Sequence, residues 1–167
     1  MSNIDNFLGF YSEKDPVTGY LSNWYRCSFK INGLTFSSSE QYMMYMKAVT
    51  FGDSIQKEAI MATDDPGTIK ACGKSVSNFD GAIWNGIRQF VMFDALMAKF
   101  GQNEELKEKL LSTGDAVLAE CSPKDIIWGI GLPLGDEGCT DTYKWRGQNL
   151  LGFTLMTVRN KLSAGET

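Results

Sequence analysis

The amino-acid sequence predicts a mainly α-helical protein of the α+β class that forms a single domain and includes one small β-hairpin. Three observations support this prediction: the length, a series of helix-capping patterns, and one strong hairpin signal. With 167 residues, the chain has the size of one domain, and such a domain buries about 70% of the surface that is exposed on unfolding. No repeat, low-complexity tract or linker divides it, so we expect one domain over residues 1–167.

The first predicted elements are a hairpin and a helix. Residues 24–36, WYRCSFKINGLTF, alternate loosely between apolar and polar side chains, and they contain an Asn-Gly pair at 32–33, the strongest short signal for a hairpin turn. Ser37 stands three residues before Glu40, which is the spacing of a capping box. This pair predicts a helix that continues to about Val49.

Three further helices each follow an aspartate in the N-cap position. The aspartates are Asp53, Asp65 and Asp80, and their helices are expected to continue to about Ala62, Ser75 and Gly101. A carboxylate in this position accepts hydrogen bonds from the free N–H groups of the first turn. The third helix is the longest, and it is predicted from apolar residues at helical spacing. They are Ile83, Ile87, Phe90, Val91, Leu96, Met97 and Phe100.

The C-terminal third of the chain predicts a surface helix, a strand and a final helix. Residues 104–114, EELKEKLLSTG, form the surface helix, and residues 116–121, AVLAEC, form a short strand. Residues 149–162, NLLGFTLMTVRNKL, are typical of an amphipathic helix. Two stretches, 11–20 and 133–143, have the composition of loops inside the domain.

The absence of histidine excludes several common kinds of active site. A Ser-His-Asp triad, a Cys-His nucleophile pair and any zinc site with an imidazole ligand all require it. The four cysteines contain no C-x-x-C pair, which argues against a zinc ribbon or a thioredoxin-like centre. We therefore expect reduced thiols, no metal, no cofactor, and acid–base chemistry that depends on carboxylates, lysines, tyrosines or cysteines.

Charge and hydropathy limit the partners and the location. The sequence shows neither a basic leader before an apolar run nor about 18 consecutive apolar residues, so we expect a cytoplasmic protein without a membrane partner. A net charge of −4 and a pI of about 4.9 disfavour a broad basic surface for nucleic acid. Phosphate recognition is expected only in a local pocket.

Eight segments, in order along the chain, carry a resemblance to a known family. They are YLSNW (20–24), SSSEQYMMYMKA (37–48), FGD (51–53), NFDGAIWNGIRQFVM (78–92), KF-x-QN-x-x-L (99–106), DIIWGIGL (125–132), WRGQNLLG (145–152) and LM-x-VR (155–159). From Phe10 to Leu162 the chain resembles the NADAR superfamily of YbiA-like proteins. One departure is Gly73-Lys74, where the family often has Gly-Arg; lysine cannot make the bidentate phosphate contact of arginine.

The resemblance implies a mainly helical fold with a pocket for ribosylated or ADP-ribosylated compounds, and an enzyme that cleaves N-glycosidic bonds. Two activities are associated with the family. One is the hydrolysis of ribosylated aminopyrimidine intermediates of riboflavin biosynthesis, and the other is the removal of ADP-ribose from guanine bases. The ligand is thus either a small free metabolite or a single ADP-ribosylated base in nucleic acid, and the acidic charge favours one of these over a long duplex.

Glu40 and Lys47 are the leading catalytic candidates. Seven residues apart, they fall about 20° apart around a helix and about 10.5 Å apart along its axis, so they share a face. Glu40 is either only the carboxylate of the capping box or an acid, base or stabiliser of an oxocarbenium-like state. Lys47 is either a surface lysine with its stem on Met43 and Met44, or a buried amine of lowered pKa that attacks a sugar carbon and forms a Schiff base.

Asp125 is a candidate for a second catalytic carboxylate, with a turn-capping role as the alternative. Trp128 either fills the core or forms a stacking wall, where the neighbouring Gly129 and Gly131 permit close approach of backbone to ligand. Trp84 presents the same choice. The resemblance favours the site for both tryptophans.

The other candidates are expected to bind substrate. Amide side chains suit sugar hydroxyls and base edges, although an asparagine serves equally well in a turn or helix cap. Basic side chains suit phosphate. These residues are Asn23, Gln148, Asn149, Arg88, Lys70 and Lys74. We expect an N-glycosidase in which Glu40, Lys47 and Asp125 share the catalytic roles; the alternatives are a non-catalytic module that binds ADP-ribose or an NAD-related ligand, and an interaction protein.

Overall fold

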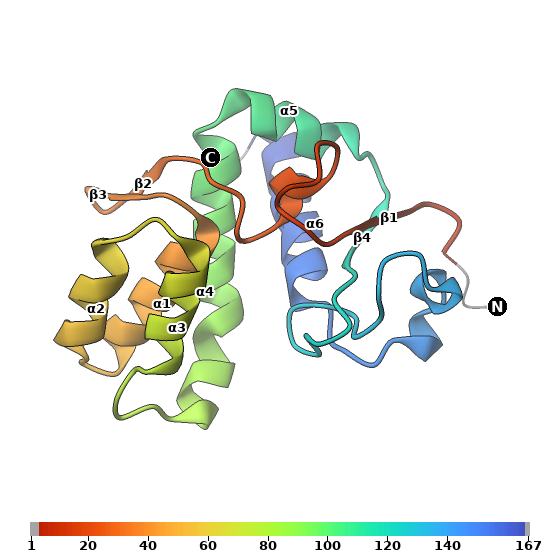
Figure 1. Ribbon diagram of the computed structural model, residues 1–167. Coiled ribbons are helices and arrows are strands. Elements are labelled where there is room, and N and C mark those ends of the chain that lie inside the picture. Colours follow the sequence, from red (N-terminus) through yellow and green to blue (C-terminus); the bar gives the residue numbers. More distant parts are fainter. Residues whose placement is uncertain (1–3, 166–167) are drawn as a thin grey trace. The chain divides into compact units, whose positions relative to one another are not determined.

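The computed structural model describes residues 4–165, and its contacts divide the chain into two compact units. The terminal unit combines the two ends of the chain, up to Ser22 and from Glu104 onward, whereas the central unit is Asn23–Asn103. Across the described residues the structure is mainly helical with short strands (Figure 1), which confirms the predicted α+β class. That the whole chain acts as one domain remains a prediction.

The central unit opens with the predicted hairpin. Strands β2 (Phe29–Ile31) and β3 (Leu34–Phe36) are antiparallel. The turn residues Asn32 and Gly33 have φ angles of 50° and 80°, as a type I′ turn requires. Gln102, at the end of the long helix of this unit, hydrogen-bonds to the backbone of Lys30 in β2. The local turn signal was therefore sufficient to locate the hairpin.

Four helices complete the central unit: α1 (Ser39–Thr50), α2 (Ser54–Met61), α3 (Pro66–Lys74) and α4 (Gly81–Gly101). Helix α1 packs against the other three, and the long α4 lies beside it in Figure 1. Asp53, Asp65 and Asp80 cap α2, α3 and α4 through their carboxylates, as predicted.

The predicted cap of α1 is wrong by one residue. Ser38, not Ser37, is the N-cap, and its hydroxyl accepts a hydrogen bond of 3.1 Å from the Gln41 N–H. Gln41 is the residue three positions after Ser38, and its side chain accepts hydrogen bonds from Ser37. Glu40 therefore takes no part in the capping box.

The buried stripe of α4 differs in part from the predicted apolar pattern. Val91, Leu96 and Phe100 are buried. However, Ile83 and Phe90 are 52% and 73% exposed. The remaining buried positions of this helix include two cations and are Trp84, Arg88, Met92, Ala95 and Lys99.

The terminal unit contains the parallel pair β1 (Phe7–Phe10) and β4 (Val117–Glu120), with Phe7 opposite Val117. Its helices are α5 (Glu104–Ser112) and α6 (Leu150–Ser163), and α6 packs on β4 and α5. Strand β4 and both helices lie at the predicted positions, whereas β1 was not predicted.

Three short 3₁₀ helices belong to the loops of the terminal unit. They are η1 (Gly19–Leu21), η2 (Glu137–Thr140) and η3 (Thr142–Lys144). A buried cluster joins the end of β4 to the long loop that follows, and its members are Ala119, Cys121, Ile130, Leu132 and Cys139. Within residues 4–165, none of the helices is long and apolar enough to span a bilayer.

Candidate functional site

The candidate residues are distributed over both units, and each group is described within its own unit. The central unit holds Asn23, Glu40, Lys47, Lys70, Lys74, Trp84 and Arg88. The terminal unit holds Asp125, Trp128, Gly129, Gln148 and Asn149.

Glu40 lies in the first turn of α1 and is only 4% exposed. Its backbone N–H donates to the carbonyl oxygen of Asn23 at 3.1 Å. Because Ser38 and Gln41 provide the cap, capping does not explain a buried carboxylate at this position. A carboxylate in such surroundings is expensive to desolvate, which favours a functional role for Glu40.

Lys47 is half-buried between α1 and α3. Its amine donates a hydrogen bond of 2.7 Å to the Gly73 carbonyl and lies 4.2 Å from the centroid of the Phe79 ring. Burial lowers the pKa of Lys47, and the charge of Glu40 partly offsets this effect. The electrostatic interaction between Glu40 and Lys47 agrees with the predicted shared helix face.

Gly73 brings the backbone of α3 close enough to receive this amine. A Cβ atom at position 73 would lie 1.9 Å from Sδ and 2.7 Å from Cγ of Met44. Only glycine therefore allows α3 to pack this closely on α1. Sequence reasoning missed both Gly73 and Phe79 as contacts of Lys47, because each reaches the amine only through tertiary packing.

Two candidates on α4 are also buried: Trp84 is 7% exposed and Arg88 is 9% exposed. Arg88 donates from Nη1 to the Asn85 side chain at 2.8 Å, yet its Nε has no hydrogen-bond partner within residues 4–165. The same is true of Asn23 Oδ1 and Ser39 Oγ. Buried polar atoms are normally paired, so these three atoms are places where a bound ligand could supply the missing partner.

Lys70 and Lys74 are exposed on α3. The amine of Lys70 lies 5.6 Å from the centroid of the Trp24 ring. The two lysines are therefore available to an anion at the surface, but they do not share the buried position of Glu40.

In the terminal unit, Asp125 caps a turn. Its Oδ1 accepts hydrogen bonds from the N–H groups of Ile127 and Trp128 at 2.9 and 2.8 Å. Trp128 is half-buried. A Cβ atom at Gly129 would lie 2.8 Å from the carbonyl oxygen of Glu120, so the close approach that this glycine permits is to a neighbouring segment of the protein.

Asn149 is fully buried and adopts a left-handed conformation, with φ of 51°. It stands at the N-cap of α6 without a capping hydrogen bond from its side chain. Instead, its carboxamide donates to the Leu118 carbonyl at 3.0 Å and accepts from the Glu120 N–H at 3.1 Å. These contacts give Asn149 a structural role along β4, whereas Gln148 is exposed.

One pocket of about 680 Å³ lies within the central unit, and it was not predicted. It is lined by residues 26–28, 35–37, Gln41 and residues 61–64. Neither Glu40 nor Lys47 contributes to its lining. Among the described residues, no three His, Cys, Asp or Glu side chains are grouped as a metal site requires.

Comparison with known proteins identifies the family. The model of the NADAR domain matches residues 9–163, and the chain therefore belongs to the NADAR family. It is 37% identical over 164 residues to the N-glycosidase R617 of Acanthamoeba polyphaga mimivirus. The aligned region covers 94% of this chain and 96% of that protein. The solved structure of Escherichia coli YbiA matches with a TM-score of 0.80 and 32% identity, over 97% of this chain and 88% of that one.

YbiA of Escherichia coli is itself named an N-glycosidase and is 33% identical over 95% of this chain and 90% of its own. These relatives confirm the predicted enzyme class, a hydrolase that acts on N-glycosyl compounds. A riboflavin biosynthesis protein of Vibrio vulnificus is 34% identical over 96% of this chain, which spans 40% of that larger protein.

Proposed function

We propose that this enzyme hydrolyses the N-glycosidic bond of a ribosylated or ADP-ribosylated compound, with Glu40 and Lys47 as the catalytic pair. The observation that supports the proposal best is a buried carboxylate whose charge acts on a half-buried amine on the same face of α1. A carboxylate can stabilise an oxocarbenium-like state or transfer a proton, and an amine of lowered pKa can act as a nucleophile.

Two reaction routes are open to this pair. In the first route, the neutral Lys47 amine attacks the anomeric carbon. The bond to the base nitrogen breaks, and Glu40 takes one proton from the attacking nitrogen and passes it to the leaving base nitrogen. The second proton of the attacking nitrogen moves to the ring oxygen as the sugar ring opens, which leaves a Schiff base. Water then adds to the imine carbon and releases the sugar and the amine. The lowered pKa of Lys47 supports this order because it increases the fraction of neutral amine.

In the second reaction route, Glu40 acts as the base that activates water, and protonated Lys47 supplies the proton to the leaving group. Borohydride reduction during turnover distinguishes the two reaction routes, because it traps a Schiff base as a stable adduct on Lys47. An unmodified Lys47 together with an active Lys47→Ala variant excludes the first reaction route. Asp125, in the terminal unit, stays a proposed catalytic carboxylate; any such role would use Oδ2, since Oδ1 accepts two backbone hydrogen bonds.

Two substrates are proposed: a ribosylated aminopyrimidine intermediate and ADP-ribosylated guanine. The likeness to a riboflavin biosynthesis protein supports the first. The net charge of −4 favours a small ligand or one extruded base over a long duplex. The four cysteines are free thiols, which supports a reducing, cytoplasmic setting.

The deciding experiment incubates the purified protein with each substrate and detects the released sugar by mass spectrometry. Release from at least one substrate supports the proposal, whereas binding without release supports a non-catalytic ligand-binding module. Glu40→Gln keeps the size of the side chain and leaves the Ser38 cap intact. Full activity of this variant would refute the catalytic role of Glu40.

A further inference from the structure

The outer edge of β3 presents an open pair of backbone hydrogen-bonding groups. Ile31 and Leu34 flank the two-residue turn and are opposite each other, so they form a hydrogen-bonded pair. The next pair, Lys30 and Thr35, is then a non-hydrogen-bonded pair, because the two kinds alternate along an antiparallel ladder. The N–H and C=O groups of both residues consequently point away from the hairpin, one pair on each outer edge.

The edge of β2 is closed by a carboxamide of the same unit. Gln102 Oε1 accepts from the Lys30 N–H and Gln102 Nε2 donates to the Lys30 carbonyl, both at 2.8 Å. Asn149 uses its carboxamide in a similar way on β4 of the terminal unit. On the edge of β3, the N–H and C=O of Thr35 have no such partner within residues 4–165, and Thr35 is exposed.

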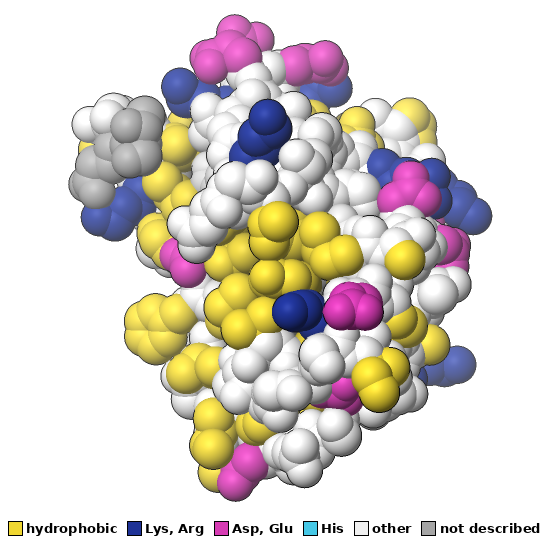
Figure 2. All heavy atoms as spheres, turned by 90° about the vertical axis from the view of Figure 1, so that its left-hand side faces the viewer, with side chains coloured by type: hydrophobic (Ala, Val, Ile, Leu, Met, Phe, Trp, Pro, Cys, Tyr) yellow, Lys and Arg dark blue, Asp and Glu magenta, His cyan; other side chains and the backbone are white. Residues whose placement is uncertain are grey.

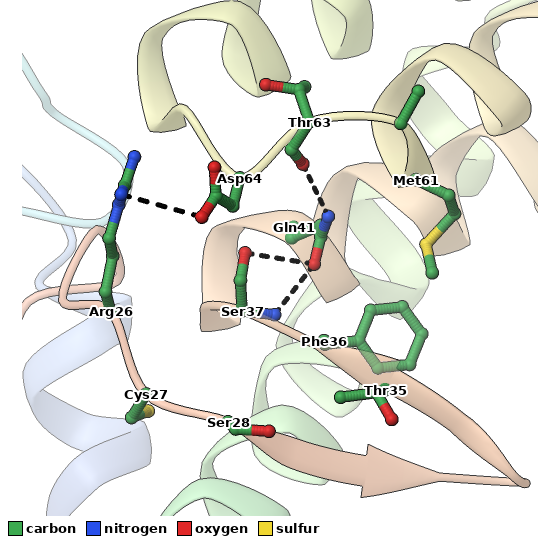
Figure 3. A pocket seen from close by; sticks show the side chains of 11 residues that line it. Arg26, Cys27, Ser28, Thr35, Phe36, Ser37, Gln41, Met61, Thr63 and Asp64 are labelled. Carbon is green, nitrogen blue, oxygen red and sulfur yellow. Dashed lines mark hydrogen bonds and ion pairs between the residues drawn. The ribbon is translucent and has the colours of Figure 1, made fainter.

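This open edge borders the pocket of about 680 Å³, because Thr35 is one of its lining residues, together with residues 26–28, 36–37, Gln41 and residues 61–64. Figure 3 shows β3 with Phe36 and Thr35 below Gln41, and Met61 and Thr63 above them. The volume falls in the range of about 300–1,000 Å³ that is usual for small-molecule sites. A ligand in the pocket can therefore reach the edge of β3.

The two sides of the pocket are held together by one side chain. Gln41 accepts from the N–H and hydroxyl of Ser37, at 2.7 and 3.1 Å, and donates to the carbonyls of Ile60 and Thr63, at 3.0 and 2.7 Å. All of these contacts are internal to the central unit, and Figure 3 draws those with Ser37 and Thr63. The pocket is thus formed in advance of binding, which lowers the ordering cost for a ligand.

The lining also offers an apolar surface. Met61 and Ala62 contribute apolar groups to it, whereas Phe36, which Tyr42 contacts edge-on with ring centroids 5.0 Å apart, is only 1% exposed. In Figure 2 the face on the side of α2 and the hairpin gathers hydrophobic side chains at its centre. Arg26 and Asp64 form an ion pair of 3.5 Å in the lining, but both are exposed, so the pair contributes little energy.

We propose that this pocket is a second ligand site, and that it binds a planar ligand with a primary carboxamide or a lactam edge. The N–H of the ligand donates to the Thr35 carbonyl, and its C=O accepts from the Thr35 N–H, as Gln102 does on Lys30. The ring of the ligand lies against the apolar lining. The proposed site is lined by Gln41 and not by Glu40, so the proposal holds whether or not the glycosidase reaction is confirmed.

The test is an NMR titration of the ¹⁵N-labelled full chain with benzamide. The matched control ligand is N,N-dimethylbenzamide, which keeps the ring and carbonyl but has no N–H. We expect benzamide to shift the Thr35 amide resonance and to bind more tightly than the control by about tenfold, the effect of one hydrogen bond. Equal binding of the two ligands, or a Thr35 amide resonance that does not shift as benzamide is added, would overturn the proposal.

Two variants locate the contact. Thr35→Pro removes the backbone N–H and is expected to weaken benzamide binding by about tenfold, whereas Thr35→Val keeps this N–H and binds as before. If Thr35→Pro fails to fold, Ala62→Phe fills the pocket without changing the strand and should abolish the shift. A blocked alanine dipeptide is the third ligand, because its backbone carries the same N–H and C=O groups. If it binds and benzamide does not, the site recognises an extended chain and the small-ligand proposal is wrong.

Discussion

Replacement of Gly73 by alanine is expected to loosen α3 from α1 and to release the amine of Lys47. The new Cβ would lie 1.9, 2.7 and 3.2 Å from Sδ, Cγ and Cβ of Met44. Rotation of the end of the methionine moves only Sδ away, so the contacts with Cγ and Cβ force a backbone shift. Such overpacking costs about 1–3 kcal/mol, while alanine in a helix returns about 1 kcal/mol. The net expectation is a loss of about 0–2 kcal/mol of stability.

Gly67 provides a control in the same helix. It is exposed, and a Cβ there meets only Asp65 Oδ2, at 3.4 Å. Gly67→Ala should therefore keep or raise stability by up to about 1 kcal/mol. Urea unfolding of both variants measures the difference. In Gly73→Ala with Met44→Ala only the 3.2 Å contact with Cβ of residue 44 remains, so a double-mutant cycle should show a favourable coupling of about 1 kcal/mol or more.

The same variant also tests the position of the Lys47 amine. A shift of the Gly73 carbonyl weakens the 2.7 Å hydrogen bond to Nζ, so the activity and its pH dependence should change together with stability. If Gly73→Ala is as stable as Gly67→Ala and keeps the activity and pH profile of the original protein, the close packing of α3 on α1 does not position Lys47.

The remaining predictions concern three other contacts. Phe79→Leu removes the aromatic ring near the charged Lys47 amine, so the pH at half-maximal activity should fall by less than about one unit; an unchanged midpoint would count against this contact. Burial lowers the pKa of Lys99 to about 8, so stability should rise as the pH increases from about 8 towards 10.5, by about 3 kcal/mol. Unfolding curves of Lys99→Met should lack this rise, and its persistence would assign it to other groups. Asn149→Ala leaves two backbone groups of β4 unpaired and should cost about 2–4 kcal/mol in urea unfolding; a loss below about 1 kcal/mol would contradict the structural role.

Elements that depend on local hydrogen bonds could be predicted from the sequence. The aspartate caps of α2, α3 and α4 and the hairpin turn at 32–33 are examples. Three consecutive serines at 37–39 made the cap of α1 ambiguous, because Ser37 with Glu40 and Ser38 with Gln41 have the same spacing. Tertiary packing decided between them.

Elements that depend on distant partners could not be predicted. Strand β1 (Phe7–Phe10) pairs with β4 (Val117–Glu120), a partner separated from it in sequence by the whole central unit, and four residues carry little periodic signal alone. Helical spacing correctly placed Glu40 and Lys47 on one face, but it could not indicate that Gly73 and Phe79 surround the amine. Nor could the pattern in α4 indicate that Lys99 is buried while Phe90 is exposed.

The pairing of β1 with β4 has a consequence for synthesis on the ribosome. Phe7–Phe10 emerges first, yet its partner Val117–Glu120 emerges only after the whole of Asn23–Asn103 has been translated. At about 5–20 residues per second, this delay lasts on the order of 5–20 s. During that time the central unit can fold while the nascent β1 has no strand partner, so this segment is where a chaperone would be expected to bind the growing chain.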